Sequence, residues 1–391
     1  MRRAFLVSLA VAVATPSVSA QFGGTGVDGV FSPASDLTLN TDTRPNGWDY
    51  SVIDIPNGVT VTLVGSNPAI LRSQTTIQID GALRADGQLG DTTTGGAGGP
   101  GGFDGGFAGA PGFGPNPGQG GSFTTGGVVR PGAGGHQFTG LFSLGSPYGS
   151  ARPFDMRGGS GGGGSFTVFA GTSGLSGGAG GGGVVVLLAD GDVTIDGELT
   201  ADGPGTQLLI FCDGCGAGGS VLVRSGGALT VGGRVSAASL GTGLPNSGDG
   251  YVRLDAYGSP VTIRPGGVVL PTPLELTLPD LEASTPVVGS PWTLSAASLP
   301  NDLVAFLFST GTASIPIPGL GVLGLDPNAG IVTLGQSPVG NTGVDPEAQF
   351  VVPIPAIPSL SGVSTSVQAL TISTSSPSGP RFSQVVTSTI L

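Results

Sequence analysis

Short runs in which apolar and polar residues alternate recur along the first two thirds of the chain. Alternation with a period of two is typical of β-strands that bury one face. Four segments align, and each holds an alternating strand, a polar or glycine turn, a second short strand, and a third strand after a glycine. They are AILRSQTTIQIDGALRADG (69–87), VVLLADGDVTIDGELTADG (185–203), VLVRSGGALTVGGRVSAAS (221–239) and VRLDAYGSPVTIRPGGVVL (252–270).

The spacing of these segments predicts a solenoid. The equivalent positions Ile79, Ile195, Val231 and Ile263 are separated by 116, 36 and 32 residues. Short strands that stack on one another with glycine at the corners form parallel β-solenoids. The pattern therefore favours an all-β chain with a glycine-rich, right-handed parallel β-solenoid, similar to a β-helix, over residues 21–269. An antiparallel meander of short strands is the alternative.

The first interval is much longer than the others, which indicates an insertion at about residues 90–183. This insertion includes the runs GGAGGPGGFDGGFAGAPGFGPNPGQGG (95–121) and GGSGGGGSFTVFAGTSGLSGGAGGGG (158–183). Flexible linkers are rich in glycine and serine and lack aromatic rings. Because phenylalanines such as Phe103, Phe107 and Phe113 are interspersed here, we expect a long loop that packs some rings on the solenoid.

The pattern changes near residue 270. Residues 270–281 (LPTPLELTLPDL) contain three prolines and are predicted to be a hinge. Beyond them, short apolar segments alternate, as at Trp292, Leu294 and Ala296. Strands at such short spacing predict a C-terminal β-sandwich over residues 282–391.

Composition narrows the function. The chain has 391 residues, of which 76 are glycine, and all 13 of its basic residues are arginine against 25 acidic ones, for a net charge of −12. Its mean hydropathy of +0.30 is unlike that of a disordered chain. Nucleic-acid binding needs a basic surface, so that class is excluded.

The N-terminus predicts export. MRRAFLVSLAVAVATPSVSA (1–20) combines Arg2 and Arg3 with an apolar run and a small-residue end, so we expect a signal peptide cleaved between Ala20 and Gln21. The arginine pair leaves the twin-arginine route as the alternative to general secretion. We expect no transmembrane span in the mature chain. It would then be extracellular or at the cell surface, with the periplasm as a further location.

The order of several segments resembles a group of glycine-rich exported proteins of environmental bacteria. The resemblance rests on DGVFSPASDLTLNT, WDYSVIDIPNGVTVTLVG, IQIDGALRADGQLG, YGSARPFDMRGGSGGGG, GGGGVVVLLADGDVTIDGELTADG and GDGYVRLDAY, within residues 27–257. It implies export and a solenoid, and it implies no activity. The sequence CDGC, just before GAGGSVLVRS, departs from the pattern.

Few residues suit catalysis or metal binding. His136 is the only histidine, so histidine-rich zinc sites are excluded, and we expect it on an exposed loop. Cys212 and Cys215 are spaced like a redox or zinc CxxC. In an exported chain a local disulfide between them is favoured.

Carboxylates are the remaining candidates. Asp80 aligns with Asp196, and Asp86 with Asp202, while Glu198 lies close by in sequence. Stacked carboxylates of this kind could bind calcium through Asp80, Asp86, Asp196 and Asp202, or act as acid and base on a glycan through Asp196, Glu198 and Asp202. Turn formation by Asp-Gly is the interpretation that we favour. Arg72 and Arg224 share a register and are the only basic residues considered as catalytic partners.

These observations predict an exported, non-enzymatic structural or surface-associated protein, similar to an adhesin or a matrix component, that needs no cofactor. Its expected partners are polysaccharides or components of the cell envelope. The alternatives are a carbohydrate-active β-helix enzyme, either a polysaccharide lyase or a hydrolase, and a glycan-binding protein. The enzyme requires two carboxylates with a basic partner in one cleft. The glycan binder requires exposed aromatic rings, for which Trp292, Tyr251 and Tyr257 are the candidates.

Overall fold

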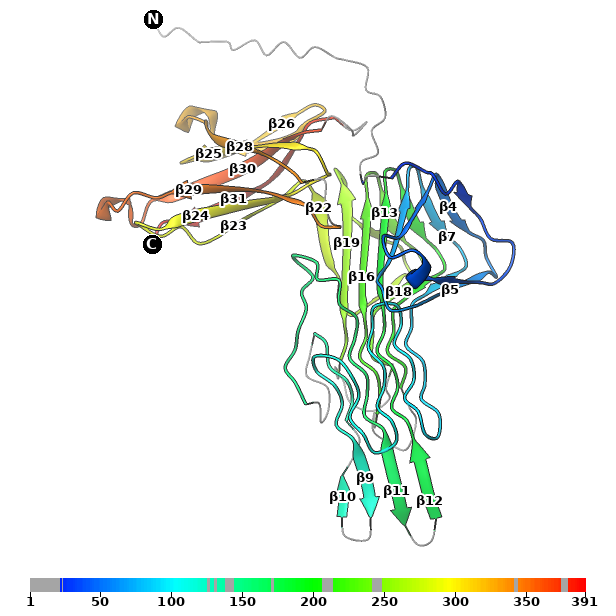
Figure 1. Cartoon of the computed structure of the whole chain (residues 1–391). Coiled ribbons are helices and arrows are strands. Elements are labelled where there is room, and N and C mark those ends of the chain that lie inside the picture. The colour runs from blue at the N-terminus through cyan, green and yellow to red at the C-terminus, as the bar shows by residue number, and fades with distance from the viewer. Residues whose placement is uncertain are drawn as a thin grey trace, which may run out of the picture.

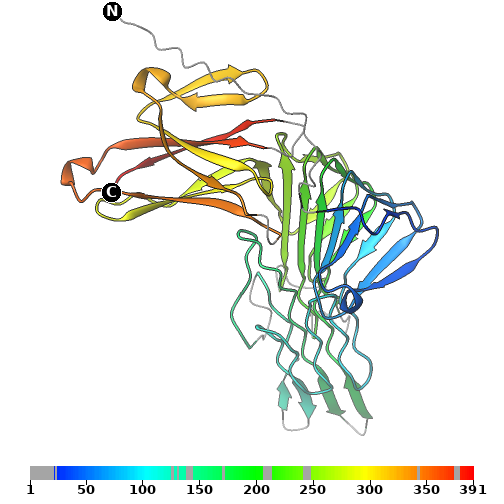
Figure 2. The same ribbon diagram turned by 45° about the horizontal axis from the view of Figure 1, so that its top comes forward.

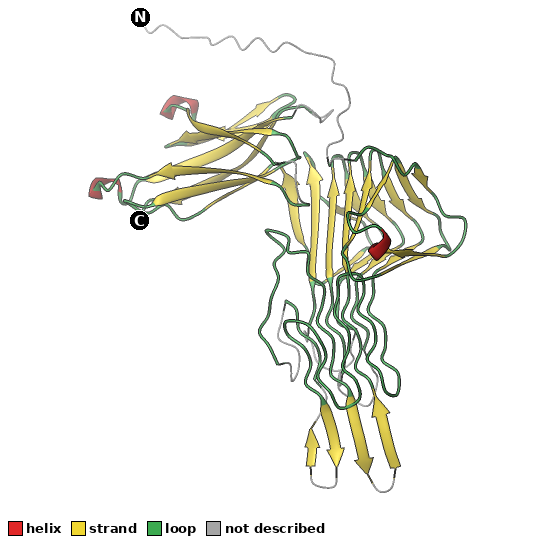
Figure 3. Ribbon diagram, in the orientation of Figure 1, coloured by secondary structure: helices red, strands yellow, loops and turns green. Residues whose placement is uncertain are grey.

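The structure is a computed structural model that describes residues 22, 24–124, 127–129, 132–137, 144–169, 172–205, 214–240, 248–340, 344–373 and 379–391. Within them the chain is all-β, with three short 3-10 helices, η1 (Thr41–Thr43), η2 (Pro327–Ala329) and η3 (Pro358–Leu360) (Figure 3). None of the described helices has the length and apolar character needed to cross a membrane. The predicted signal peptide and the cleavage site at Ala20 and Gln21 lie outside the described residues.

Three six-stranded parallel sheets form the solenoid, residues 30–278 (Figure 1). The first sheet consists of β1 (Val30–Phe31), β4 (Val52–Ile55), β7 (Ile77–Ile79), β14 (Val193–Ile195), β17 (Leu229–Val231) and β20 (Thr262–Ile263). The second consists of β2 (Leu37–Asn40), β5 (Thr60–Val64), β8 (Ala82–Arg84), β15 (Glu198–Thr200), β18 (Arg234–Ser236) and β21 (Val268–Leu270). The third consists of β3 (Trp48–Tyr50), β6 (Ala69–Ser73), β13 (Val184–Ala189), β16 (Ser220–Ser225), β19 (Tyr251–Tyr257) and β22 (Leu274–Leu278).

Residues that the sequence alignment of the repeats places at equivalent positions are paired in the first sheet. Ile195 pairs with Ile79 on one side and with Val231 on the other, and Val231 pairs with Ile263. The first three are fully buried, whereas Ile263 is 40% exposed because it lies on the edge strand. Parallel pairing is therefore confirmed and the antiparallel meander is wrong. The handedness of the solenoid stays a prediction.

The glycine-rich runs form an ordered array that extends from the solenoid, with β9 (Gly121–Thr124), β10 (Gly127–Val129), β11 (Ser165–Phe169) and β12 (Thr172–Ser176) at its far end (Figure 1). We call residues 85–121, 132–135, 158–164, 177–183, 201–205 and 214–219 the glycine array. Most of it is drawn as loop in Figure 3. The expected loop excursion is therefore an ordered structure, and segments outside residues 90–183 join it.

Backbone hydrogen bonds order the array with a repeat of three residues. The amides of Gly177, Gly180 and Gly183 donate to the carbonyls of Asp91, Gln88 and Ala85. The amides of residues 178 and 181 donate to the carbonyls of residues 106 and 103. The amides of residues 179 and 182 donate to the carbonyls of residues 214 and 217, and all these bonds are 2.7–2.8 Å long. Three residues per turn is the geometry of a polyproline II-type helix, which has no internal hydrogen bonds and so presents its amides to neighbouring chains.

Close backbone contact explains the glycine content of the array. A Cβ built on Gly181 would lie 1.9 Å from the carbonyl oxygen of Gly159, and one on Gly163 would lie 1.8 Å from that of Gln119. Chains this close leave no room for side chains, as at the axis of collagen. Phe107 and Phe113 are 55% and 50% exposed, so the expectation that some rings pack on the solenoid gains no support from these two and stays a prediction for the others.

The C-terminal domain, residues 280–391, contains two antiparallel sheets around one core (Figure 2). One sheet consists of β23 (Asp280–Ala283), β24 (Pro291–Ala297) and β29 (Glu347–Pro353). The other consists of β25 (Leu303–Ser309), β28 (Val332–Pro338), β30 (Ser364–Ile372) and β31 (Arg381–Thr389). A separate hairpin is formed by β26 (Thr312–Ile317) and β27 (Gly321–Leu325). The predicted alternation is confirmed, because Trp292, Leu294 and Ala296 are all buried.

The two domains share a buried junction. Val186, Leu222 and Tyr257 on the outward face of the third sheet belong to one buried cluster with Leu299 and Val344 of the C-terminal domain. This sheet is thus covered on both faces, as the continuous apolar run in β13 suggests. The predicted hinge differs from the structure, because β22 pairs with β19 and continues the solenoid sheet.

Candidate functional site

Asp86 and Asp202 are two candidate carboxylates that lie on adjacent rungs and are linked by a hydrogen bond. They follow the adjacent strands β8 and β15, where the solenoid passes into the glycine array. Oδ1 of Asp86 accepts the amide of Asp202 at 2.7 Å, and Oδ1 of Asp202 accepts the amide of Ala238 at 2.8 Å. Each carboxylate therefore satisfies a backbone amide of the next rung, which is a structural use of its oxygens.

Both carboxyl groups are buried, and burial raises the pKa of each. Desolvation raises the pKa of Asp202 to about 6, against hydrogen bonds from Ser236 and Ala238 that lower it and with the Asp86 charge adding to the rise. The same cause raises the pKa of Asp86. Oδ2 of Asp202 accepts Nη2 of Arg234 at 2.7 Å. A raised carboxyl pKa is a common property of catalytic acids, yet this group is 2% exposed and its oxygens already accept hydrogen bonds.

The other candidate carboxylates each have a different side-chain partner, although Asp80 and Asp196 follow paired residues of adjacent strands. Asp196 lies at the corner between β14 and β15, where both its oxygens accept Nη1 of Arg264 at 2.8 and 3.0 Å. Glu198 accepts Nη2 of Arg84 at 2.8 Å, and Asp80 accepts the amide group of Gln78. Within the described part of the chain, no three His, Cys, Asp or Glu side chains form a group that could hold a metal ion.

His136 is fully buried, so its expected exposure is wrong. Its ring packs between those of Tyr148 and Tyr251, with centroids at 4.6 and 5.1 Å, and Nδ1 lies 2.9 Å from the carbonyl oxygen of Gly218. Burial lowers the pKa of His136 to about 4. The histidine is therefore neutral near pH 7 and packs where the glycine array meets β19.

The predicted disulfide between Cys212 and Cys215 is not tested by the structure. Cys215 is buried, and Cys212 lies outside the described residues, so the disulfide stays a prediction.

The exposed aromatic rings that glycan binding was expected to require are not found at Trp292 and Tyr257, which are 3% and 2% exposed and pack inside the protein. Tyr251 is half-buried and packs on His136.

A buried group of charges joins the two domains. Arg253 forms bonds of 2.5 and 2.8 Å to Asp345 and of 2.9 Å to Asp255, and Nε of Arg224 lies 2.9 Å from Asp255. All four side chains are at most 5% exposed. Burial alone would raise the pKa of Asp345, but the charges of Arg224 and Arg253 hold it below its usual value.

This charged group also limits the catalytic candidates. Arg72 and Arg224 share a register, as predicted, because both pair with Leu188 of β13. Arg224 is buried among carboxylates and is not accessible to a substrate. Neither Arg253 nor Asp345 was a candidate from the sequence. The charges at alternate positions of YVRLDAY are the signal that could have indicated Arg253.

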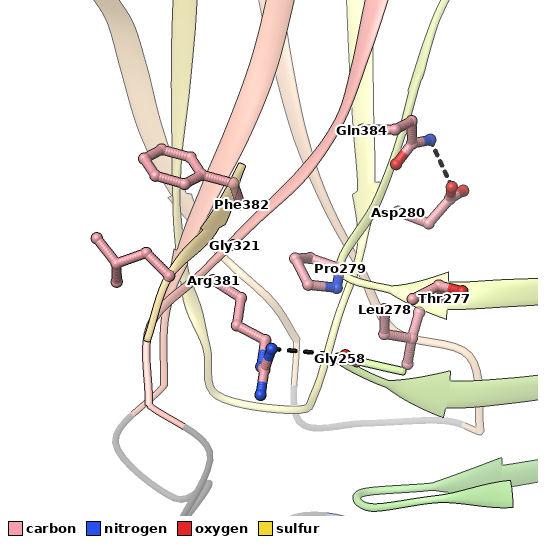
Figure 4. Close-up of a pocket in the computed structure, with 10 residues that line it drawn as sticks. Gly258, Thr277, Leu278, Pro279, Asp280, Gly321, Arg381, Phe382 and Gln384 are labelled. Atoms are coloured by element: carbon pink, nitrogen blue, oxygen red, sulfur yellow. Dashed lines mark hydrogen bonds between the residues drawn. The ribbon is translucent and has the colours of Figure 1, made fainter. Parts of the chain in front are cut away.

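A pocket of about 420 Å³ lies where the end of the solenoid meets the C-terminal domain. Its lining residues come from β22 and the turn after it, from the end of β19, and from β27 and β31 (Figure 4): Gly258, Thr277, Leu278, Pro279, Asp280, Leu320, Gly321, Arg381, Phe382 and Gln384. Pockets at domain interfaces commonly bind ligands. None of these residues was a candidate from sequence, because the pocket exists only when the domains meet.

The fold and the pocket define an all-β chain in which a β-helix-like solenoid, a glycine array and an antiparallel domain meet around a junction pocket. Comparisons of this chain with protein-family models, with curated proteins and with solved structures find no match.

Proposed function

We propose that this protein is an exported, non-enzymatic structural protein of the cell surface or of an extracellular matrix. The observation that carries the proposal is the continuous backbone hydrogen bonding from the solenoid strands into the glycine array. Ser220 at the start of β16 donates to Gly183, and Gly183 donates to Ala85 just after β8. An extended body tied along its length by such bonds suits a scaffold.

In this proposal the parts have separate roles. Residues 1–20 direct export, and the mature chain begins at Gln21. The right-handed solenoid and the glycine array form the scaffold, while the C-terminal domain is a β-sandwich that is fixed to it. Cys212 and Cys215 form a disulfide, as suits an oxidising compartment.

The rival enzymatic function has less support. A glycosidase needs two carboxyl groups facing one substrate bond, at about 5–10 Å from each other. Asp196 and Glu198 are instead engaged by Arg264 and Arg84, and Asp202 is buried. Glycan binding is a second candidate, and the junction pocket favours it.

Fractionation of the native host combined with N-terminal sequencing tests the proposal. We expect the chain outside the cytoplasm with Gln21 as its first residue. The purified mature protein, incubated with a panel of polysaccharides with and without calcium, should release no reducing or unsaturated ends. An uncleaved chain in the cytoplasm would contradict the proposed location. New ends that disappear in an Asp196→Asn variant would establish the enzyme instead.

A further inference from the structure

Arg381 stands out among the arginines that the structure describes. Eight of them form ion pairs with carboxylates, and only Arg72 and Arg381 form none within the described residues. Arg72 lies near Asp49, whose charge acts on it, and donates to the carbonyl oxygen of Asn46. Nε of Arg381 is buried without a hydrogen-bond partner, and Nη1 makes one long contact of 3.5 Å to the carbonyl oxygen of Gly258.

An uncompensated cation is unusual in this chain, which has 25 acidic residues against 13 basic ones. Burying a charged group is costly unless it is paired and hydrogen-bonded. A guanidinium carries five N–H donors in a planar fork that matches a carboxylate. Arg381 therefore has donor capacity for an anion that is not part of the described chain.

The surrounding residues fix the position of this guanidinium. Its Cζ lies 5.8 Å from the ring centroid of Tyr257, whose hydroxyl donates to the carbonyl oxygen of Gly379 at 3.2 Å. Gly258 has a φ of +70°, and a Cβ there would lie 2.4 Å from Nε of Arg381. The glycine thus makes room for the guanidinium, which loses little conformational freedom when a ligand binds.

The rest of the pocket suits a ring that has both apolar and hydroxylated edges. Leu320 and Phe382 are partly exposed and supply apolar surface, while Leu278 and Pro279 are buried beneath the pocket, and Thr277 supplies an exposed hydroxyl. Figure 4 shows Arg381 turned toward Gly258, with the hydrogen-bonded pair of Gln384 and Asp280 on the other side of Pro279.

The acidic residue of the pocket already has hydrogen-bond partners within the protein. Asp280 accepts hydrogen bonds from Gln384 and from Arg152. Arg152 also pairs with Glu282 and Glu347, so Asp280 belongs to a group of three carboxylates that share one arginine. Asp280 forms no ion pair with Arg381, so both charged ends of the guanidinium's hydrogen-bonding fork stay available to an anion.

We propose that the junction pocket binds a carboxylate-bearing sugar unit of an acidic polysaccharide, with the sugar carboxylate on the Arg381 guanidinium. The inference rests on the proposed function, because that function makes polysaccharides the partners of the exported chain. It assigns the ligand class to acidic rather than neutral glycans, although the protein itself is acidic.

Calorimetric titration of the purified mature protein with oligogalacturonate tests the inference. The fully methyl-esterified oligomer of the same length is the matched control ligand, because it keeps the sugar backbone and replaces each charged carboxylate by a neutral ester. We expect the acid form to bind and the ester to bind at least tenfold more weakly. Equal affinity for the two forms, or no binding of the acid, would overturn the assignment.

Variants then locate the binding. Arg381→Gln should weaken binding of the acid form at least tenfold, while Arg72→Gln, the matched control, should leave it unchanged. Should Arg381→Gln fail to fold, Arg381→Lys keeps the charge and removes the planar fork, and we expect an intermediate loss. Unchanged binding in the folded Arg381 variant would refute the site.

A competition experiment distinguishes binding of the sugar from binding of any simple anion. Galacturonate monomer should displace the oligomer at lower concentration than acetate or phosphate does. Equal displacement by the simple anions would overturn the sugar assignment. These results concern the purified protein, so they stand apart from the fractionation that tests export. Loss of the pocket assignment would leave the scaffold function intact.

Discussion

The glycine array makes a sharp prediction about a single methyl group. In Gly181→Ala, the new Cβ would lie 1.9 Å from the carbonyl oxygen of Gly159 and 2.3 Å from its carbonyl carbon. Carbon and oxygen atoms of adjacent chains normally approach to about 3.3–3.6 Å. The two segments must therefore separate by roughly 1.4 Å, and neighbouring segments surround residues 177–183 and oppose the movement.

The cost follows from the hydrogen bonds that this movement breaks. The amides of Gly159 and Gly162 donate to the carbonyls of Gly182 and Ala179, each at 2.8 Å. Stretching both bonds by about 1 Å leaves buried polar groups unsatisfied, at about 1–3 kcal/mol each. We expect Gly181→Ala to lower the free energy of unfolding by about 2–6 kcal/mol and the melting temperature by at least about 2 °C.

Thermal unfolding followed by circular dichroism, with hydrogen exchange of residues 177–183, measures the effect. Gly340→Ala is the matched control, because it makes the same change where the nearest described atom is 3.9 Å from the new Cβ and φ is not positive. We expect that control to melt within about 1 °C of the parent. A Gly181→Ala protein that melts with the parent and keeps slow exchange in the array would refute the proposed packing.

Three further predictions concern buried charges. Arg253→Met leaves Asp345 buried without its main partner, so chemical denaturation should show a loss of about 3–5 kcal/mol; an unchanged midpoint would mean that the charged junction adds no stability. The pKa of Asp202, raised to about 6, means that the folded state binds more protons than the unfolded state between about pH 4 and 6, so this group makes the protein less stable as pH rises through that window. Buried His136, with its pKa lowered to about 4, makes the protein more stable as pH rises, so the quantity to measure is the difference in unfolding free energy between Asp202→Asn and the parent. We expect the stability of the variant relative to the parent to increase by up to about 3 kcal/mol between about pH 4 and 6. The same pH dependence in both proteins would contradict the raised pKa of Asp202. Asp196→Asn removes one exposed ion pair to Arg264 and should change stability by less than about 1 kcal/mol in the same assay, whereas a larger loss would mean that the pair is structural.

The sequence by itself determined the strands and the register of the four aligned repeats. Alternation places Ile79, Ile195 and Val231 on one buried face, because a strand has only two faces and a one-residue slip would expose every apolar side chain. The same local rule located the buried face of β24 at Trp292 and Leu294. Stacking of Asp86 on Asp202 also followed from the alignment, since parallel strands in register repeat each position one rung further on.

Only the tertiary structure decided what the glycine runs and the charged residues do. Glycine carries no side-chain pattern, so its sequence cannot distinguish a loose loop from an array whose order lies in hydrogen bonds between distant segments. His136 looked exposed because its neighbours are glycines, and those glycines bring the backbones close enough to bury it. The partners of Arg253 and the isolation of Arg381 depend on which surface of the C-terminal domain meets the solenoid. The Arg253–Asp255 pair lies within one strand, but the pairing of Arg253 with Asp345 and the burial of both are properties of that contact between domains.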